Sequence, residues 1–371
     1  MHSYPLRTLC ALLALAMAGL AAPVPAAQVE GLYRAEVGSA DLVLLDAYDG
    51  EELAPAFDSR QARREALMRA ALARVLIRLS GTSQVAADPL VQAELLASAE
   101  GFVNRYQFVG SGSSQPRLRV QFNGQAVREA LWKTGWPVWG RYRPGVVVWV
   151  AQRGAGGLNL ASPDVAPELF KALRETAERY GLPLLVPLMD SMDRRRLSGR
   201  DLLFEDWNRI RSASERYDPD AVLLLRLGSP DSGSSNAEWV LRRNGEVRTF
   251  TTGGEGPEAA FRDGLKRILA RLACDYAVFP GQPVTMQAAV DGIRDLQEYA
   301  RVERGLARLA AIDSVTPVRV DGEQARFRFH FQGPVEGADH ILGLLDLLEP
   351  RQRPDTEETE DRAPLHFTYR P

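Results

Sequence analysis

The chain has very little cysteine and histidine. Its two cysteines are Cys10, in an apolar run near the start of the chain, and Cys274, in a helical pattern. A single cysteine cannot form an internal disulfide, so once Cys10 is removed we expect Cys274 to be a buried, inert thiol. The histidines show neither HxxxH nor HExxH spacing and have no cysteine partners nearby. We therefore expect no metal site and no cofactor.

The common catalytic signatures are also missing. The sequence contains no GxSxG nucleophile elbow, and it has no Gly-Lys pair, which excludes a Walker-type phosphate loop. The glycine-rich stretch at residues 154–157 lacks the GxGxxG spacing of a dinucleotide-binding loop. We expect the protein not to be an enzyme. An enzyme with an unrecognised site is the alternative that the sequence leaves open.

The charge balance gives no reason to expect nucleic-acid binding. The formal net charge is −3 and the pI is about 6. Lysine is almost absent (Lys133, Lys171 and Lys266), so arginine carries most of the positive charge. After the first residues, no apolar run approaches the roughly 20 residues that a bilayer-spanning helix needs. We therefore expect no membrane span in the mature protein.

Residues 1–26 have the three-part plan of a secretory signal peptide. Arg7 precedes an uncharged apolar run from Leu9 to Ala22, and Val24-Pro25-Ala26 has the small residues of a cleavage site. The run is shorter than a membrane-spanning helix, and the prolines that follow it would end a helix there. We predict export across the inner membrane, cleavage near residue 26, and a periplasmic mature protein.

Residues 27–140 are predicted to form an α+β domain. Apolar side chains recur every four residues over 59–79, which is typical of an amphipathic helix. Strands over 102–109 and 117–122 should form a hairpin, and a helix over 125–134 should follow. The many arginines of the first helix are compatible with a membrane-surface helix. We favour a domain helix with a charged solvent face.

Residues 141–281 are predicted to form a three-layer α/β domain with a mixed sheet. The apolar runs 146–151, 182–186 and 221–227 alternate with helical segments, including one over 201–216. This βαβαβ order requires parallel strands. A hairpin turned by an Asn-Gly pair then precedes a long helix.

Residues 282–371 are predicted to form a ferredoxin-like domain with the element order βαββαβ. The strand over 324–331 alternates strictly between two kinds of side chain. Its apolar face carries Ala325, Phe327, Phe329 and Phe331, and its polar face carries Arg326, Arg328 and His330. The chain is therefore expected to be a multi-domain α+β and α/β protein.

Candidate site residues lie at strand ends and at one aromatic segment. In doubly wound sheets, ligands bind beyond the carboxyl ends of the strands. Two carboxylates without a base or a metal-ligand set do not define an active site, so a solvated loop is the alternative. The residues after strands are Asp190, Asp193, Arg194, Gly156 and Asp231.

Trp136 and Trp139 form the aromatic segment between the first two regions. They could form an exposed recognition surface. The other interpretation is that they seal the joint, because large aromatic side chains contribute most when they are buried.

Three segments together resemble one family of exported proteins. They are GLYRAEV at 31–37, VLIRLSG at 75–81, and WPVWGRYRP at 136–144 leading into the apolar run at 146–151. On these segments the chain resembles the DUF2066 family, exported gammaproteobacterial proteins without an assigned function. The resemblance covers nearly the whole mature chain. It implies no catalytic residues.

These observations favour a non-enzymatic accessory or adaptor protein of the cell envelope with an envelope protein as its partner. The alternative is a binding module for a small anionic or glycan ligand in the central domain. Nothing in the sequence sets the oligomeric state.

Overall fold

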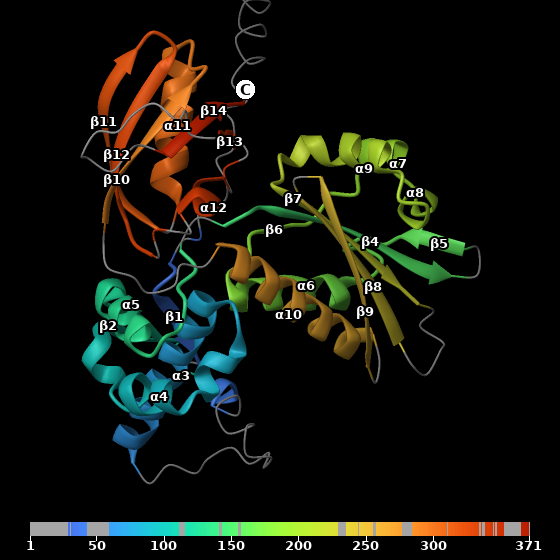
Figure 1. Cartoon of the computed structure of the whole chain (residues 1–371). Helices are drawn as coiled ribbons and strands as arrows, with labels where there is room; N and C mark the ends of the chain where they lie inside the picture. Colours follow the sequence, from blue (N-terminus) through green and yellow to red (C-terminus); the bar gives the residue numbers. More distant parts are fainter. Residues whose placement is uncertain are drawn as a thin grey trace, which may run out of the picture.

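The computed structural model has a mixed α/β architecture with several sheets (Figure 1). The residues that it describes are 29, 31–42, 59–110, 116–140, 143–154, 157–228, 235–243, 245–254, 257–276, 284–309, 311–333, 335, 338–343, 345, 347–351 and 365–370. The predicted signal peptide, Gly156 and Asp231 lie outside this set, as does the side chain of Cys274.

The N-terminal sheet is small and antiparallel, with the strand order β1-β3-β2. Its strands are β1 (Arg34–Val37), β2 (Val103–Val109) and β3 (Arg117–Phe122). The helical segments around it are η1 (Ser39–Asp41), α3 (Arg60–Ser80), η2 (Ser83–Ala87), α4 (Pro89–Val91), η3 (Gln92–Leu96), η4 (Ala99–Phe102) and α5 (Gly124–Lys133). These elements share one apolar core.

Helix α3 is the centre of that core, and its predicted position is confirmed. It begins after Ser59, whose Oγ accepts a hydrogen bond from the N–H of Ala62 at 3.0 Å, and it ends at Gly81, whose φ is +73°. Two of its arginines turn toward β1 instead of solvent. Arg74 donates to the carbonyl of Glu36 at 2.8 Å, and Arg78 donates to the carbonyl of Arg34 at 2.9 Å. Arg74 and Arg78 therefore hold the helix to β1, whereas Arg60, Arg63 and Arg69 are exposed.

The central sheet has the order β5-β4-β7-β8-β9, with β6 paired to β4. The strands are β4 (Val146–Gly154), β5 (Gly157–Leu160), β6 (Leu184–Leu185), β7 (Ala221–Leu227), β8 (Ser235–Arg243) and β9 (Glu246–Gly254). As predicted, β4 pairs in parallel with β6 and with β7, and β8 and β9 form an antiparallel hairpin. Gly154, at the end of β4, pairs with Gly157, at the start of the antiparallel β5. The glycine stretch at 154–157 therefore stands between two strands and not between a strand and a helix.

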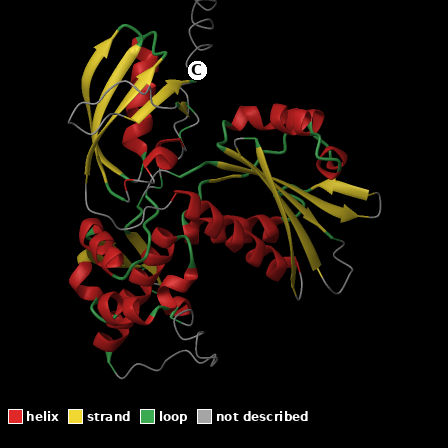
Figure 2. Ribbon diagram, viewed as in Figure 1, coloured by secondary structure: helices red, strands yellow, loops and turns green. Residues whose placement is uncertain are grey.

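Helices cover both faces of the central sheet (Figure 2). Helices α6 (Pro167–Tyr180) and α10 (Pro257–Tyr276) lie on one face. The other face carries α7 (Ser191–Arg196), α8 (Gly199–Leu203), α9 (Trp207–Ser214) and η5 (Glu215–Tyr217). The prediction of one helix over 201–216 is wrong, because Glu205 has a φ of +53° and Asp206 begins a new helix. The strand expected over 182–186 is also shorter than predicted.

The C-terminal sheet has the order β11-β12-β10-β14-β13, in which β10 and β14 are parallel and the other pairs are antiparallel. Its elements are β10 (Val284–Asp291), α11 (Leu296–Arg308), β11 (Ile312–Asp321), β12 (Gln324–Phe331), α12 (Ala338–Gly343), β13 (Leu348–Pro350) and β14 (Leu365–Tyr369). The alternation predicted for β12 is confirmed, since its phenylalanines are buried in the core while Arg328 and His330 are exposed. Strand β13 was not predicted.

No helix in the described part of the chain has both the length and the apolar character needed to cross a bilayer.

Candidate functional site

The strongest candidate site is the loop that joins β6 to α7, with the polar side chains around it. We call residues 186–192 the Leu188 loop. Asp190 is the N-cap of α7, and its Oδ1 accepts hydrogen bonds from the N–H groups of Met192 at 2.9 Å and Asp193 at 3.0 Å. A carboxylate at this position satisfies amides that have no partner within the helix. The cap therefore fixes the first turn of α7 and, with it, the direction of Asp193.

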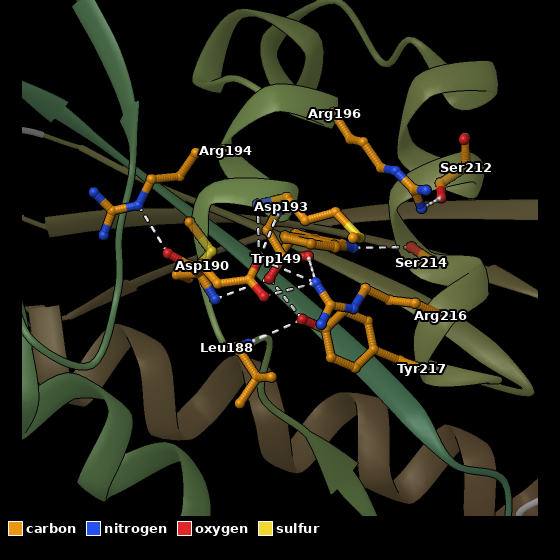
Figure 3. Close-up of polar contacts among 12 residues, drawn as sticks. Trp149, Leu188, Asp190, Asp193, Arg194, Arg196, Ser212, Ser214, Arg216 and Tyr217 are labelled. Atoms are coloured by element: carbon orange, nitrogen blue, oxygen red, sulfur yellow. Dashed lines mark hydrogen bonds and ion pairs between the residues drawn. The ribbon is translucent and has the colours of Figure 1, made fainter. Parts of the chain in front are cut away.

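Asp193 is fully buried and binds three donors (Figure 3). Its Oδ2 accepts from the hydroxyl of Tyr217 at 2.6 Å and from the N–H of Met189 at 2.9 Å. Its Oδ1 accepts from the guanidinium of Arg216 at 3.1 Å. A buried charge is costly unless it is paired and hydrogen-bonded, and here both oxygens are engaged.

The same donors tie Asp193 to the backbone of the Leu188 loop. The hydroxyl of Tyr217 donates to Asp193 and also accepts from the N–H of Leu188 at 3.0 Å. On the other side of the loop, Nε of Arg194 donates to the carbonyl of Met189 at 2.8 Å. Tyr217 is itself held by an edge-to-face contact with Trp149, with 6.1 Å between the ring centroids. Side chains thus bind the N–H groups of Leu188 and Met189 and the carbonyl group of Met189.

The backbone held in this way is strained. Met189 has a φ of +55°, a value that residues other than glycine rarely adopt, and its side chain is buried against the sheet. Leu188, the residue before it, is 70% exposed, and in Figure 3 its side chain points away from the polar cluster. The cluster therefore holds an unfavourable backbone conformation that presents an apolar side chain to solvent.

The electrostatics of the cluster stabilise these contacts. The pKa of Asp190 lies below its ordinary value, mainly because the N–H of Asp193 donates to it, with a further contribution from Arg216. Burial, together with the hydrogen bond to Asp193, raises the pKa of Tyr217 to about 12. The pKa of Arg216 is raised, first by its bond to Asp190. At neutral pH the phenol is therefore protonated and donates.

The arrangement is suited to positioning and not to acid–base chemistry. Both carboxylates already bind donors, and Asp193 is closed off from solvent. A general base must reach the proton that it removes, and Asp193 has no free lone pair directed outward. In the described residues no group of three or more His, Cys, Asp or Glu side chains is arranged to hold a metal ion.

Sequence reasoning identified part of this cluster. Of the candidate residues, the structure brings Asp190, Asp193 and Arg194 together around the Leu188 loop. Arg216 and Tyr217 were missed. In the sequence, both residues stand at the end of a helical segment shortly before β7. This position does not indicate that their side chains contact α7.

The two tryptophans do not form an exposed surface together. Nε1 of Trp136 donates to Asp88 at 3.1 Å, and the ring is partly buried in the core around α3. Trp139 is fully buried in the core of the central sheet, whereas its neighbour Val138 belongs to the core around α3. Trp139 therefore cannot contact a partner directly, and it lies where two cores meet.

Arg143 completes this joint. Its guanidinium lies over the ring of Trp139, with 4.1 Å from Cζ to the centroid, and is 2% exposed. It donates to the carbonyls of Arg78 at 2.6 Å and Tyr180 at 2.7 Å, which lie at the C-terminal ends of α3 and α6. It also binds the carbonyls of Trp139, Gly140 and Gly181. Burial lowers its pKa to about 9, so the side chain stays charged at neutral pH between two negative helix ends.

Comparison with known proteins corrects the expected family. A family model described as a domain of unknown function, DUF8605, matches residues 45–140. The expectation of DUF2066 is therefore wrong, because the match found is to a different family. No curated protein and no solved structure matches the chain. The matched residues include α3, β2 and β3, so the similarity concerns the N-terminal region and ends at Gly140, just before the central sheet.

Proposed function

We propose that the protein is an exported, periplasmic accessory or adaptor protein of the cell envelope, and that the Leu188 loop is a contact surface for an envelope protein. We interpret its sheets as three domains over 27–140, 141–281 and 282–371, of which the central one is three-layered and the last is ferredoxin-like. The signal-peptide pattern supports export.

The conformation of the Leu188 loop carries the proposal. Leu188 is exposed, while the peptide that follows it is held by Tyr217, Asp193 and Arg194. Met192, at the start of α7, is exposed as well. A strained backbone that exposes two apolar side chains is unfavourable for the isolated chain, and such strain is typical of functional sites. An apolar side chain carried on a fixed backbone also binds a partner at a lower entropic cost than one on a mobile loop.

The alternative of a small anionic ligand in the central sheet receives less support. Arg226 is a buried cation near the carboxyl end of β7, the edge of the sheet where such ligands bind. Its guanidinium already donates to Glu205 and to Glu238, both at 2.9 Å. An anion would have to displace two carboxylates to reach it. We therefore favour the adaptor function.

Site-specific photo-crosslinking in cells tests the proposal. A photo-reactive residue replaces Leu188 in one variant and, as a matched control, the similarly accessible Leu296 at the start of α11 in another. We expect the exported protein to form a discrete adduct with an envelope protein from position 188 and not from position 296. We also expect Met192→Ser to weaken that adduct.

Two results would refute the proposal. If the chain remains in the cytoplasm with its first residues intact, export is wrong. If the exported protein gives the same adducts from both positions, or none from position 188, the Leu188 loop is not a contact surface.

A further inference from the structure

We propose that the free edge of β2 binds an extended segment of a partner protein as an added strand, and that this segment alternates acidic and apolar side chains. The inference rests on the adaptor function, which it deepens by naming the chemistry of a partner. It uses a surface separate from the Leu188 loop, so the two can fail independently.

The first observation is the position of β2 in its sheet. Within the described residues β2 pairs with β3 and with no other strand. Proteins usually protect a sheet edge with proline, a bulge or a cover. Here the irregular pairing is confined to the start of the strand, between Val103 and Arg105, and the strand contains no proline. Residues 105–109 therefore form a regular edge whose outward backbone groups pair with no other strand of the described part of the chain.

The second observation is the inner face of the strand. Tyr106 and Phe108 pair with Val120 and Leu118 of β3, which are completely buried in the core around α3. Opposed residues lie on the same face of a sheet, so the two aromatic side chains also lie on the core side. They are nevertheless 44% and 48% exposed. The apolar face of the sheet thus continues beyond the part that the helices cover.

The third observation is the charge of the outer face. Arg105 and Gln107 lie beside Gln121 and Arg119 of β3, in a row that continues to Arg34 of β1. Glu36 is the carboxylate in this row, and it already pairs with Arg119 at 2.8 Å and with Arg117 at 3.0 Å. Among the described residues Arg105 has no carboxylate partner. The outer face therefore keeps an excess of positive charge.

These faces determine the chemistry of the added strand. Because successive side chains of a strand point to opposite faces, every second residue of the partner would extend the aromatic face and the others would lie beside the arginines. Apolar residues fit the first position and aspartate or glutamate the second. A second copy of this chain fits less well, since it would bring two arginine-rich outer faces together.

The test uses the full chain and a synthetic probe. The probe is a capped, fluorescently labelled octapeptide that alternates glutamate and valine. One control peptide alternates lysine and valine, and another has the probe's composition in two blocks. Binding is followed by fluorescence anisotropy, and amide hydrogen exchange locates the protected residues. We expect the alternating acidic peptide to bind and to slow exchange at residues 104–109.

Matched variants identify the surface. Arg105→Glu should weaken binding by about tenfold or more, because like charges then face each other. Arg328→Glu makes the same change at an exposed side chain of β12, an inner strand of the C-terminal sheet, and should leave the affinity unchanged. Tyr106→Ser combined with Phe108→Ser should abolish binding. Circular dichroism checks that each variant is folded.

Several outcomes would overturn the inference. They are no binding of the acidic peptide, equal binding of the lysine peptide or of the block peptide, and equal affinity in Arg105→Glu. A dimer that forms through β2 and excludes the peptide would show that a second copy occupies the edge. Leu188→Ser should not change peptide affinity, so a failure here leaves the crosslinking result of the Leu188 loop standing.

Discussion

Replacing Asp193 by asparagine removes the buried charge that holds the Leu188 loop while keeping the shape of the side chain. The amide oxygen can replace only one of the two carboxylate oxygens, so the amide NH₂ must face either Arg216 or the N–H of Met189, both of which are donors. A hydrogen bond to a charged group is worth about 1.5–3 kcal/mol, and one is lost while the others weaken. We expect the loop to be destabilised by about 2–4 kcal/mol.

Amide hydrogen exchange measures this change where it occurs. A loss of this size corresponds to about 30- to 1,000-fold faster exchange at Leu188 and Met189, if these amides exchange through local opening. Asp190→Asn is the matched control in the same loop. Asparagine caps a helix as well as aspartate does, and the ion pair that this variant loses is solvent-exposed. It should change exchange at the two amides only slightly.

Equal effects of the two substitutions would refute the reasoning. So would unchanged exchange at Leu188 and Met189 in Asp193→Asn, because the buried carboxylate would then not be what holds the strained peptide. Faster exchange spread evenly over the central sheet would place the role of Asp193 in the core and not in the Leu188 loop.

Two further predictions concern the central sheet. Tyr217→Phe should lower the free energy of unfolding by about 1–3 kcal/mol at pH 7–9. Because the folded-state pKa is raised from 10 to about 12, the wild-type advantage is complete below pH 10 and declines as the pH rises toward 12, so urea unfolding curves of the two proteins should converge there. Gly264→Ala in α10 should be destabilising by about 1–3 kcal/mol, although alanine favours helices, because its Cβ would lie 2.1 Å from the indole of Trp239. Gly305→Ala in α11 has its nearest contact at 3.3 Å and serves as the control, and equal melting temperatures of the two variants would contradict the packing argument.

The spacing of apolar side chains correctly predicted the elements that depend only on residues close to one another in sequence. Helix α3 and the alternation of β12 follow from spacing alone, and both are present. The split of the predicted helix over 201–216 depends on a positive φ at Glu205 and a cap at Asp206, which periodicity does not reveal. Strand β13 has only three residues and depends on its pairing with β14.

The candidate site was predicted only where a topological rule applies. Asp190, Asp193 and Arg194 follow a strand of a parallel sheet, so the rule for ligand positions selected them. Their partners Arg216 and Tyr217 come from a turn more than twenty residues later in the chain, and no local pattern links the two segments. The exposed aromatic face of β2 could not be predicted from the sequence either. The hairpin pattern predicts the strand, but it does not show how much of the strand the helices cover.

The environment of Arg143 has a consequence for any partner that uses both proposed surfaces. Its charge is stabilised by backbone carbonyls of α3, α6 and the segment between them. Carbonyl groups do not take up a proton as a carboxylate does, so acidification does not weaken these contacts. Salt also screens such buried contacts weakly. The angle between the N-terminal and central sheets should therefore be the same at low and high ionic strength. The two proposed surfaces, the β2 edge and the Leu188 loop, would then stay at a fixed distance from each other. A partner whose own sites match that spacing gains avidity, and a partner with a different spacing does not.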